Sequence, residues 1–144
     1  MKQIFGVFAL LAVSVAGCGS NDGGTPTSPS AAPTINVAFS ATDLRVGTGA
    51  EATTGRNVTV RYAGWLYSTT AADNKGTPFD SGTINITVGQ GVIQGFSMGV
   101  NGMRVGGLRR VVIPPNLGYG NNTPGAPIRP NETLLFEIEL LAVQ

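Results

Sequence analysis

Residues 57–67 of this chain are NVTVRYAGWLY. Apolar and polar side chains alternate through this stretch, so Val58, Val60 and Tyr62 fall on one side of an extended chain and Thr59 and Arg61 on the other. Strict alternation of this kind predicts a strand with one buried and one solvated face. Such strands are typical of antiparallel sheets, and we take this stretch as the starting point for the fold.

Three other stretches favour strands in the same sheet. Residues 133–143, TLLFEIELLAV, place Phe136, Ile138 and Leu140 opposite two glutamates. Residues 83–89, TINITVG, also alternate, and residues 108–113, LRRVVI, form a shorter apolar run. Because several half-buried strands need a second layer to cover them, we expect a covering element elsewhere in the chain.

One segment alone has helical spacing. Phe96, Val100 and Met103 succeed one another at intervals of four and three, which puts them on one face of a helix. Gly99 and Gly102 each cost up to about 1 kcal/mol relative to alanine, so this helix depends on packing against the sheet. The sequence therefore predicts an α+β fold, a twisted sheet wrapped around one short helix. Residues 68–78 are expected to form an exposed turn between two strands.

The composition argues against metal-dependent chemistry, catalytic-triad chemistry and nucleic-acid binding. The 144 residues contain no histidine, one cysteine and 12% charged residues, with a formal net charge of +1. Histidine is the commonest metal ligand and general base, and a lone cysteine forms neither an internal disulfide nor a thiolate cluster. No run of lysine or arginine indicates nucleic-acid binding. The glycines at 89, 91 and 95 miss the dinucleotide-binding spacing, so we expect no cofactor.

The N-terminus has the features of an export signal. Lys2 precedes the apolar residues 4–16, which are too few to span a bilayer as a helix. Residues 15–18, VAGC, resemble the bacterial lipobox, which implies a signal peptide over residues 1–17 and a lipidated Cys18. An ordinary signal peptide with an incidental cysteine is the alternative.

Beyond Cys18 we expect a tether and then a domain. Residues 18–38 are rich in glycine, proline and serine and predict a flexible linker, succeeded by one domain over residues 39–144. By the same resemblance, Gly19 after the cysteine favours the outer membrane, facing the periplasm of a bacterial cell envelope. We expect a monomer held to the membrane by the lipid.

Residues 113–130, IPPNLGYGNNTPGAPIRP, join two predicted strands. Five prolines and three glycines rule out a helix there and disfavour a strand. Loops of this length inside a compact domain are usually functional or disordered. The loop also carries a tyrosine, Tyr119, between two glycines.

The chain resembles FKBP-type peptidyl-prolyl cis-trans isomerases in six motifs that occur in the family's order. They are VRYAGWLY (60–67), PFDSG (78–82), GQGVIQGF (89–96), GMRVGG (102–107), RRVVIPPNLGYG (109–120) and NETLLFEIELL (131–141). The resemblance covers residues 44–144 and implies an antiparallel sheet of five to six strands around a short helix. It also implies that the loop around Tyr119 arches over a pocket.

The resemblance implies a largely apolar site with nine residues. In it the Asp80 carboxylate lies at the rim, the Tyr119 hydroxyl points inward and the Ile93 backbone N–H donates to a substrate carbonyl. The other members form walls and floor: Tyr62, Phe79, Val92, Phe96, Ile128 and Phe136.

Three positions depart from the family pattern. Phe96 stands where relatives usually have tryptophan, Ile84 stands where many have phenylalanine, and residues 81–83 are shorter than the usual bulged segment. We expect a deeper or repacked pocket, with macrolide binding and the preference for residues flanking proline most affected.

The implied function is acceleration of X–Pro bond rotation in exported or unfolded polypeptides, with proline-containing chains as partners and macrolides such as rapamycin as candidate ligands. One alternative is a binding or chaperone module of the same fold on the cell envelope with weak catalysis. Another is a structural surface lipoprotein without activity.

Overall fold

The computed structural model describes residues 35–144. The expected signal peptide, the expected lipidated Cys18 and most of the expected tether lie outside these residues. In the part of the chain that the structure describes, no helix has the length and apolar character needed to cross a bilayer. The first strand begins at Ser40, directly after Phe39, whose side chain packs against the core.

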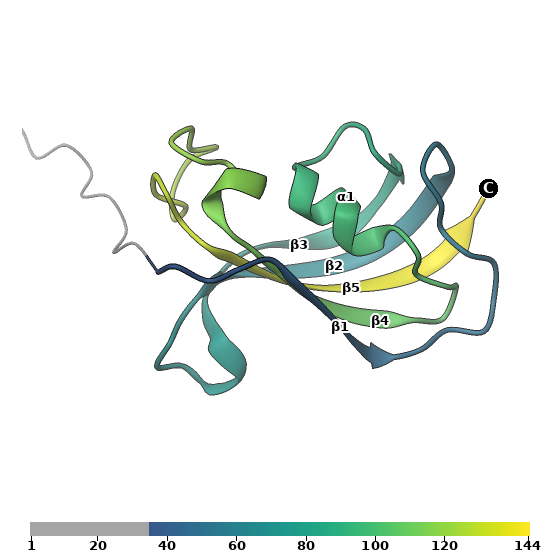
Figure 1. Cartoon of the computed structure of the whole chain (residues 1–144), viewed down its shortest axis with the longest axis horizontal. Helices are drawn as coiled ribbons and strands as arrows, with labels where there is room; N and C mark the ends of the chain where they lie inside the picture. The colour runs from purple at the N-terminus through teal and green to yellow at the C-terminus, as the bar shows by residue number, and fades with distance from the viewer. Residues whose placement is uncertain (1–34) are drawn as a thin grey trace, which may run out of the picture.

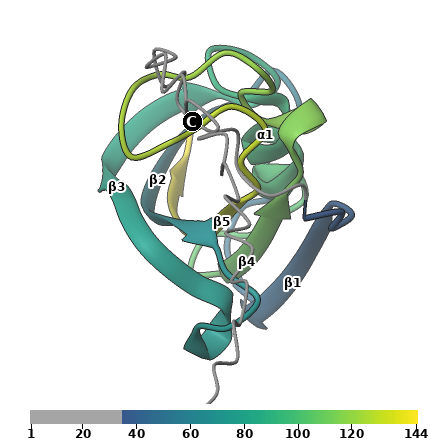
Figure 2. The same ribbon diagram turned by 90° about the vertical axis from the view of Figure 1, so that its left-hand side faces the viewer.

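Five strands form one antiparallel sheet, and the sheet curves around a single α-helix (Figures 1 and 2). The strands occur across the sheet in the order β1-β4-β5-β2-β3, and every neighbouring pair is antiparallel. The bounds are β1 Ser40–Arg45, β2 Asn57–Tyr67, β3 Lys75–Thr87, α1 Gln94–Val100, β4 Leu108–Ile113 and β5 Leu134–Val143, with 3-10 turns η1 Ala72–Asn74 and η2 Pro115–Leu117. The predicted α+β architecture is confirmed.

The core lies between α1 and the concave face of the sheet. The predicted alternation holds: Val58 and Val60 of β2 and Ile138 and Leu140 of β5 are at most 1% exposed. Glu137 and Glu139 lie on the opposite, convex face and are only partly buried. A sheet with one packed and one solvated face is what the sequence pattern predicts.

Two glycines let α1 approach the sheet closely. The space that a side chain at Gly99 would occupy is filled by Val111 of β4, and Gly95 meets Ile113 even more closely. The two glycines lower the intrinsic helix propensity of α1, and the close packing against the sheet that they permit stabilises the helix. Gly102 adopts a φ of +80° just beyond the helix, where a left-handed residue is common after a C-cap.

Three local expectations differ from the structure. Met103 is buried but lies beyond the helix, which ends at Val100. The turn after β2 is shorter than residues 68–78, because β3 already begins at Lys75 and Pro78 pairs with Trp65. Strand β1 has no counterpart among the predicted strands, since all six of its residues are exposed and show no apolar alternation.

Candidate functional site

Strands β2 and β3 bring Tyr62 and Asp80 to the same place. Between Tyr62 and Gly64 on β2, the pairing with β3 is regular, and Gly64 pairs with Asp80. The Tyr62 hydroxyl donates a hydrogen bond of 2.7 Å to Asp80 Oδ2, and the backbone N–H of Ser81 donates to Asp80 Oδ1 at 2.9 Å. These two bonds fix the carboxylate at the rim of the concave face.

A bulge in β3 turns Phe79 toward the same side. Gly64 pairs with Asp80 and Trp65 pairs with Pro78, so Phe79 is an additional residue without a partner in β2. An extra residue of this kind re-aims the side chains next to it. The pairing is continuous from Asp80 to Ile84, so the short segment 81–83 contains no bulge.

Four aromatic rings form a cluster at the base of the site, called here the aromatic cluster: Tyr62, Phe79, Phe96 and Phe136. The rings of Phe79 and Phe96 lie edge-on to Phe136, with centroids 5.4 and 5.2 Å from it. Tyr62 lies edge-on to Phe96 at 5.8 Å. Such perpendicular contacts are the preferred arrangement of aromatic pairs and hold the rings in fixed orientations.

Gly64 leaves the space in which two of these rings meet. A Cβ atom at this position would lie 2.7 Å from Phe79 Cζ and 2.9 Å from Phe136 Cε1. Real Cβ atoms do not approach other heavy atoms so closely, so a side chain here would displace a ring. Sequence reasoning missed Gly64, although a glycine within a strand often marks a bulge or the close approach of another group, and that signal could have found it.

Val92 and Ile93 lie at the entrance to α1 and pack against the core as partly buried side chains. Ile93 is the residue before the helix, and its carbonyl accepts from Phe96 and Ser97. Among residues 35–144, its N–H donates to no acceptor. A free backbone donor beside an apolar surface is available to a substrate carbonyl.

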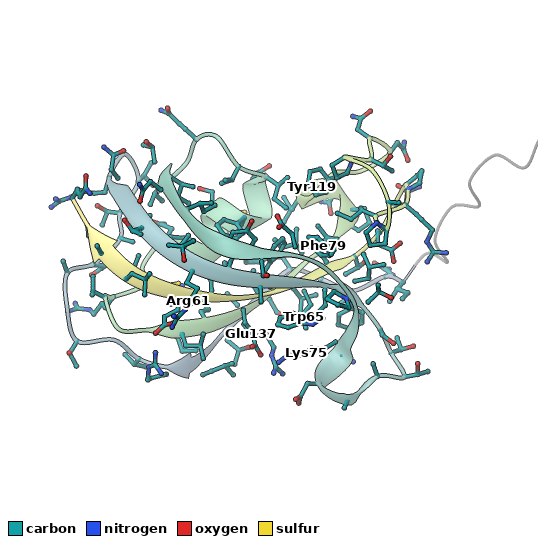
Figure 3. The ribbon with its side chains drawn as sticks, turned by 180° about the vertical axis from the view of Figure 1, so that it is seen from behind. Arg61, Trp65, Lys75, Phe79, Tyr119 and Glu137 are labelled. Atoms are coloured by element: carbon teal, nitrogen blue, oxygen red, sulfur yellow. The ribbon has the colours of Figure 1, made fainter. Side chains whose placement is uncertain are left out.

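The proline-rich loop, residues 114–133, carries Tyr119, which is partly buried and packs against the core. Its fold is fixed by backbone bonds: Gly120 N–H donates to the Pro115 carbonyl at 2.9 Å, and Asn131 N–H donates to the Gly120 carbonyl at 2.7 Å. Ile128 is 7% exposed and belongs to the core. Tyr119 and Phe79 lie on the same side of the sheet in Figure 3.

Burial and the negative charge of Asp80 raise the pKa of both tyrosines of the site, Tyr62 and Tyr119. Burial, the hydrogen bond to Asp80 and the negative charge of Asp80 raise the pKa of Tyr62 to about 12. Burial and the same carboxylate also raise the pKa of Tyr119. Both hydroxyls therefore remain protonated at neutral pH and can donate hydrogen bonds.

Of the nine predicted site residues, the structure brings five into direct contact: Tyr62, Phe79, Asp80, Phe96 and Phe136. Tyr119 lies close enough to feel the charge of Asp80. Val92, Ile93 and Ile128 pack against the same core. The role of each residue in the reaction remains a prediction.

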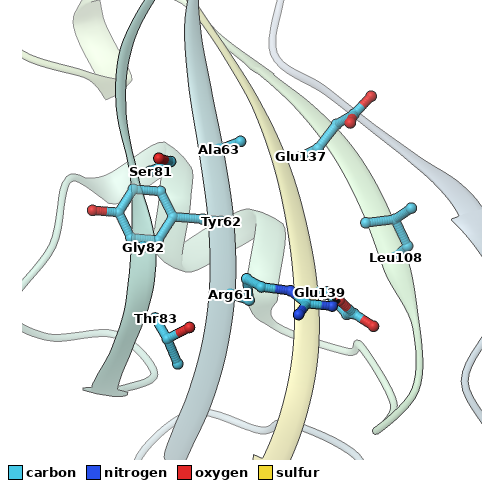
Figure 4. Close-up of a pocket in the computed structure, with 9 residues that line it drawn as sticks. All are labelled: Arg61, Tyr62, Ala63, Ser81, Gly82, Thr83, Leu108, Glu137 and Glu139. Carbon is cyan, nitrogen blue, oxygen red and sulfur yellow. Dashed lines mark hydrogen bonds and ion pairs between the residues drawn. The ribbon is translucent and has the colours of Figure 1, made fainter.

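The convex face has a separate cavity of about 440 Å³, drawn in Figure 4. Nine residues line it: Arg61, Tyr62, Ala63, Ser81, Gly82, Thr83, Leu108, Glu137 and Glu139. Its charged groups already pair within the protein: Glu139 with Arg61 and Arg45, and Glu137 with Lys75 and Arg110. Tyr62 of the aromatic cluster is among the residues that line this cavity, but Phe79, Phe96 and Phe136 are not, and the cavity is not the site that the motifs predict.

Comparison with known proteins identifies the family. Residues 49–141 match the model of the FKBP-type peptidyl-prolyl cis-trans isomerases. An FK506-binding protein of Neisseria meningitidis serogroup B is 45% identical over 108 residues, which cover 70% of this chain and 92% of the relative.

Two solved structures agree with this fold. FkpA from Escherichia coli has a TM-score of 0.63 and 32% identity, over 78% of this chain and 51% of its own. A peptidyl-prolyl cis-trans isomerase from Pseudomonas syringae pv. tomato DC3000 has the same score and identity, over 82% and 84% of the two chains. With the motifs, the sheet and the family model in agreement, this chain belongs to the FKBP-type peptidyl-prolyl cis-trans isomerases.

Proposed function

We propose that this isomerase rotates X–Pro bonds over the aromatic cluster, beneath the proline-rich loop. The observation that carries the proposal is the cluster of four aromatic rings beside Asp80, with Tyr119 on the same side of the sheet as Phe79. The Ile93 N–H, which donates to no acceptor among residues 35–144, adds a donor for the substrate. The substrates are proline-containing segments of unfolded or exported polypeptides, which expose the prolyl ring to such a site.

The mechanism needs no covalent step. Rotation about a peptide bond costs about 18–20 kcal/mol, because twisting breaks the amide resonance. The planar amide is more polar than the twisted one, so an apolar surface favours the twisted form relative to the ground state. Lowering the barrier by about 7 kcal/mol would accelerate rotation about 10⁵-fold.

Two polar groups are proposed to orient the substrate in this surface. The Ile93 N–H donates to the carbonyl of the substrate chain, and the Tyr119 hydroxyl, kept protonated by its raised pKa, donates from the loop above. Phe79, Phe96 and Phe136 then receive the pyrrolidine ring. Each contact holds the chain on either side of the bond while the bond itself turns.

The test is exchange of a short X–Pro peptide, monitored by NMR at micromolar protein. We expect catalysed exchange with the wild type and a large loss with Phe79→Ala or Tyr119→Phe. Thr83→Ala is the matched control, because Thr83 is exposed on the same strand outside the aromatic cluster. Full activity in a variant that combines Phe79→Ala with Tyr119→Phe would place catalysis elsewhere. Peptide binding without exchange would favour the alternative of a binding or chaperone module.

We further propose that Cys18 carries a lipid that holds the domain to a bacterial envelope membrane, in the outer membrane facing the periplasm. The support is the VAGC motif at residues 15–18 and the glycine directly after it. Two acyl chains give stable attachment where one does not. Metabolic labelling with palmitate should mark the full-length chain and not Cys18→Ser, and membrane fractionation should separate the two proteins.

Macrolide binding and a monomeric state complete the proposal. Relatives carry FK506 in their names, and we propose that a macrolide such as rapamycin occupies the aromatic cluster here too. With Phe96 in place of tryptophan, we expect weaker binding than the family pattern implies, because the floor offers less apolar surface. Rapamycin titration of the exchange assay tests macrolide binding, and analytical ultracentrifugation tests the monomeric state.

A further inference from the structure

Asp80 is the single acidic side chain of residues 35–144 without a cationic partner. Every other aspartate and glutamate in this part of the chain pairs with a lysine or arginine at 3.9 Å or less: Asp43, Glu51, Asp73, Glu132, Glu137 and Glu139. The unpaired carboxylate is thus the one at the rim of the substrate site. An acid left without a counterion at a binding site offers its charge to a ligand.

The bonds that hold Asp80 leave room for such a partner. The carboxylate accepts one hydrogen bond at each oxygen, from Tyr62 and from the Ser81 N–H. A carboxylate has about four acceptor positions, so two remain. The residue is exposed, and the neighbouring Gly82 has no side chain to cover it.

The surroundings of Asp80 fix its position without neutralising it. Both held oxygens accept from neutral donors, a phenol and a backbone amide. The phenol belongs to Tyr62, which is itself held by its edge-on contact with Phe96. The carboxylate is therefore a fixed negative charge beside the proposed prolyl surface, and substrates with a cation at the matching place gain from it.

We propose that Asp80 gives this isomerase a preference for polypeptides with a lysine or arginine next to the proline. The inference rests on the proposed function, since it assigns the prolyl residue to the aromatic cluster. Ion pairs at exposed sites are modest, so we expect a preference of about two- to fivefold in kcat/KM. Asp80 acts here as a specificity-determining residue that contacts the flanking side chain, not the rotating bond.

The experiment compares two otherwise identical peptides by exchange NMR. One peptide carries lysine next to the proline, and the other carries Nε-acetyl-lysine, which keeps the aliphatic stem and removes the charge. Two such pairs are made, one with this residue directly before the proline and one with it directly after the proline. We expect the lysine peptide to be the better substrate of the wild type in at least one pair. Asp80→Asn should bring that ratio to about one, and salt at about 0.5 M should lower it, because exposed charges are screened.

Glu51→Gln is the matched control, because it removes one negative charge where Glu51 pairs with Arg104, outside the site. Its ratio should equal that of the wild type. Equal turnover of charged and acetylated peptides in both pairs would overturn the inference while leaving the isomerase site standing. So would a preference that persists in Asp80→Asn, whose fold circular dichroism checks. A wild type that exchanges no peptide would instead overturn the proposed site together with this inference.

Discussion

A Cβ atom added to Gly99 would lie 2.6 Å from Val111 Cγ2, so helix α1 rests on strand β4 through bare backbone. Alanine would raise the helix propensity by up to about 1 kcal/mol, yet overpacking a core costs about 1–3 kcal/mol. We expect Gly99→Ala to lower the free energy of unfolding by about 1–2 kcal/mol in urea denaturation. Gln94→Ala, at an exposed position of the same helix, should leave it nearly unchanged. Equal stability of Gly99→Ala and wild type would contradict the close packing.

Gly64 and Gly82 provide a second matched pair, on neighbouring strands at the site. A Cβ at Gly64 would collide with Phe79 and Phe136, whereas one at Gly82 would meet Tyr62 Cε1 at 3.9 Å, an ordinary contact. We therefore expect Gly64→Ala to reduce kcat/KM by about tenfold through displacement of the rings. Gly82→Ala should keep nearly full activity in the same exchange assay. The opposite order of effects would show that the rings are not held as described.

Alkaline pH should destabilise the protein through Tyr62. Its pKa is raised from 10.0 to about 12, so the folded state keeps its proton while the unfolded state loses it. The contribution is therefore complete below pH 10 and is lost as pH rises toward 12. In urea denaturation series across this interval, Tyr62→Phe should lose stability less steeply than the wild type. Parallel curves would exclude the shift.

Acidic pH should act through Glu139 on the convex face. The hydrogen bond from Arg61, which outweighs partial desolvation and is aided by Arg45, lowers the pKa of Glu139 below 4.5. A depressed pKa gives stability that is present above 4.5 and is lost as pH falls through the folded-state value. Glu139→Gln should therefore be less stable than wild type at neutral pH, and the difference should shrink below pH 4.5. A difference that stays constant with pH would contradict this linkage.

The sequence was sufficient to predict strands in which apolar and polar side chains alternate, because that alternation shows which face is buried. Residues 57–67 and 108–113 are strands β2 and β4 with the predicted bounds. Strand β1 was not predicted because its sequence, SATDLR, has no apolar face. It is a strand because it pairs with β4. The first half of β3 was not predicted because Gly76 and Pro78 are turn-forming residues. Pairing with β2 overrides their local preference for a turn.

For the site, the sequence predicted which residues take part but few of the contacts between them. The family motifs named Tyr62, Asp80 and Tyr119, yet periodicity alone would have assigned Tyr62 to the core. The hydrogen bond from Tyr62 to Asp80 depends on the register of two strands, and the absence of a counterion among residues 35–144 depends on where every other charge lies. Such facts arise from pairing across the chain, which local patterns do not encode.

Strand β5 leaves the proline-rich loop at Leu134 and runs for 10 residues to Val143. At about 3.3 Å per residue, it carries the last residue, Gln144, roughly 30 Å from the loop, to the far end of the sheet in Figure 1. An affinity handle or fluorophore joined there would stand clear of the aromatic cluster. Immobilisation through Gln144 would thus leave the prolyl surface open to solution, which suits this end of the molecule to single-molecule or sensor-chip measurement.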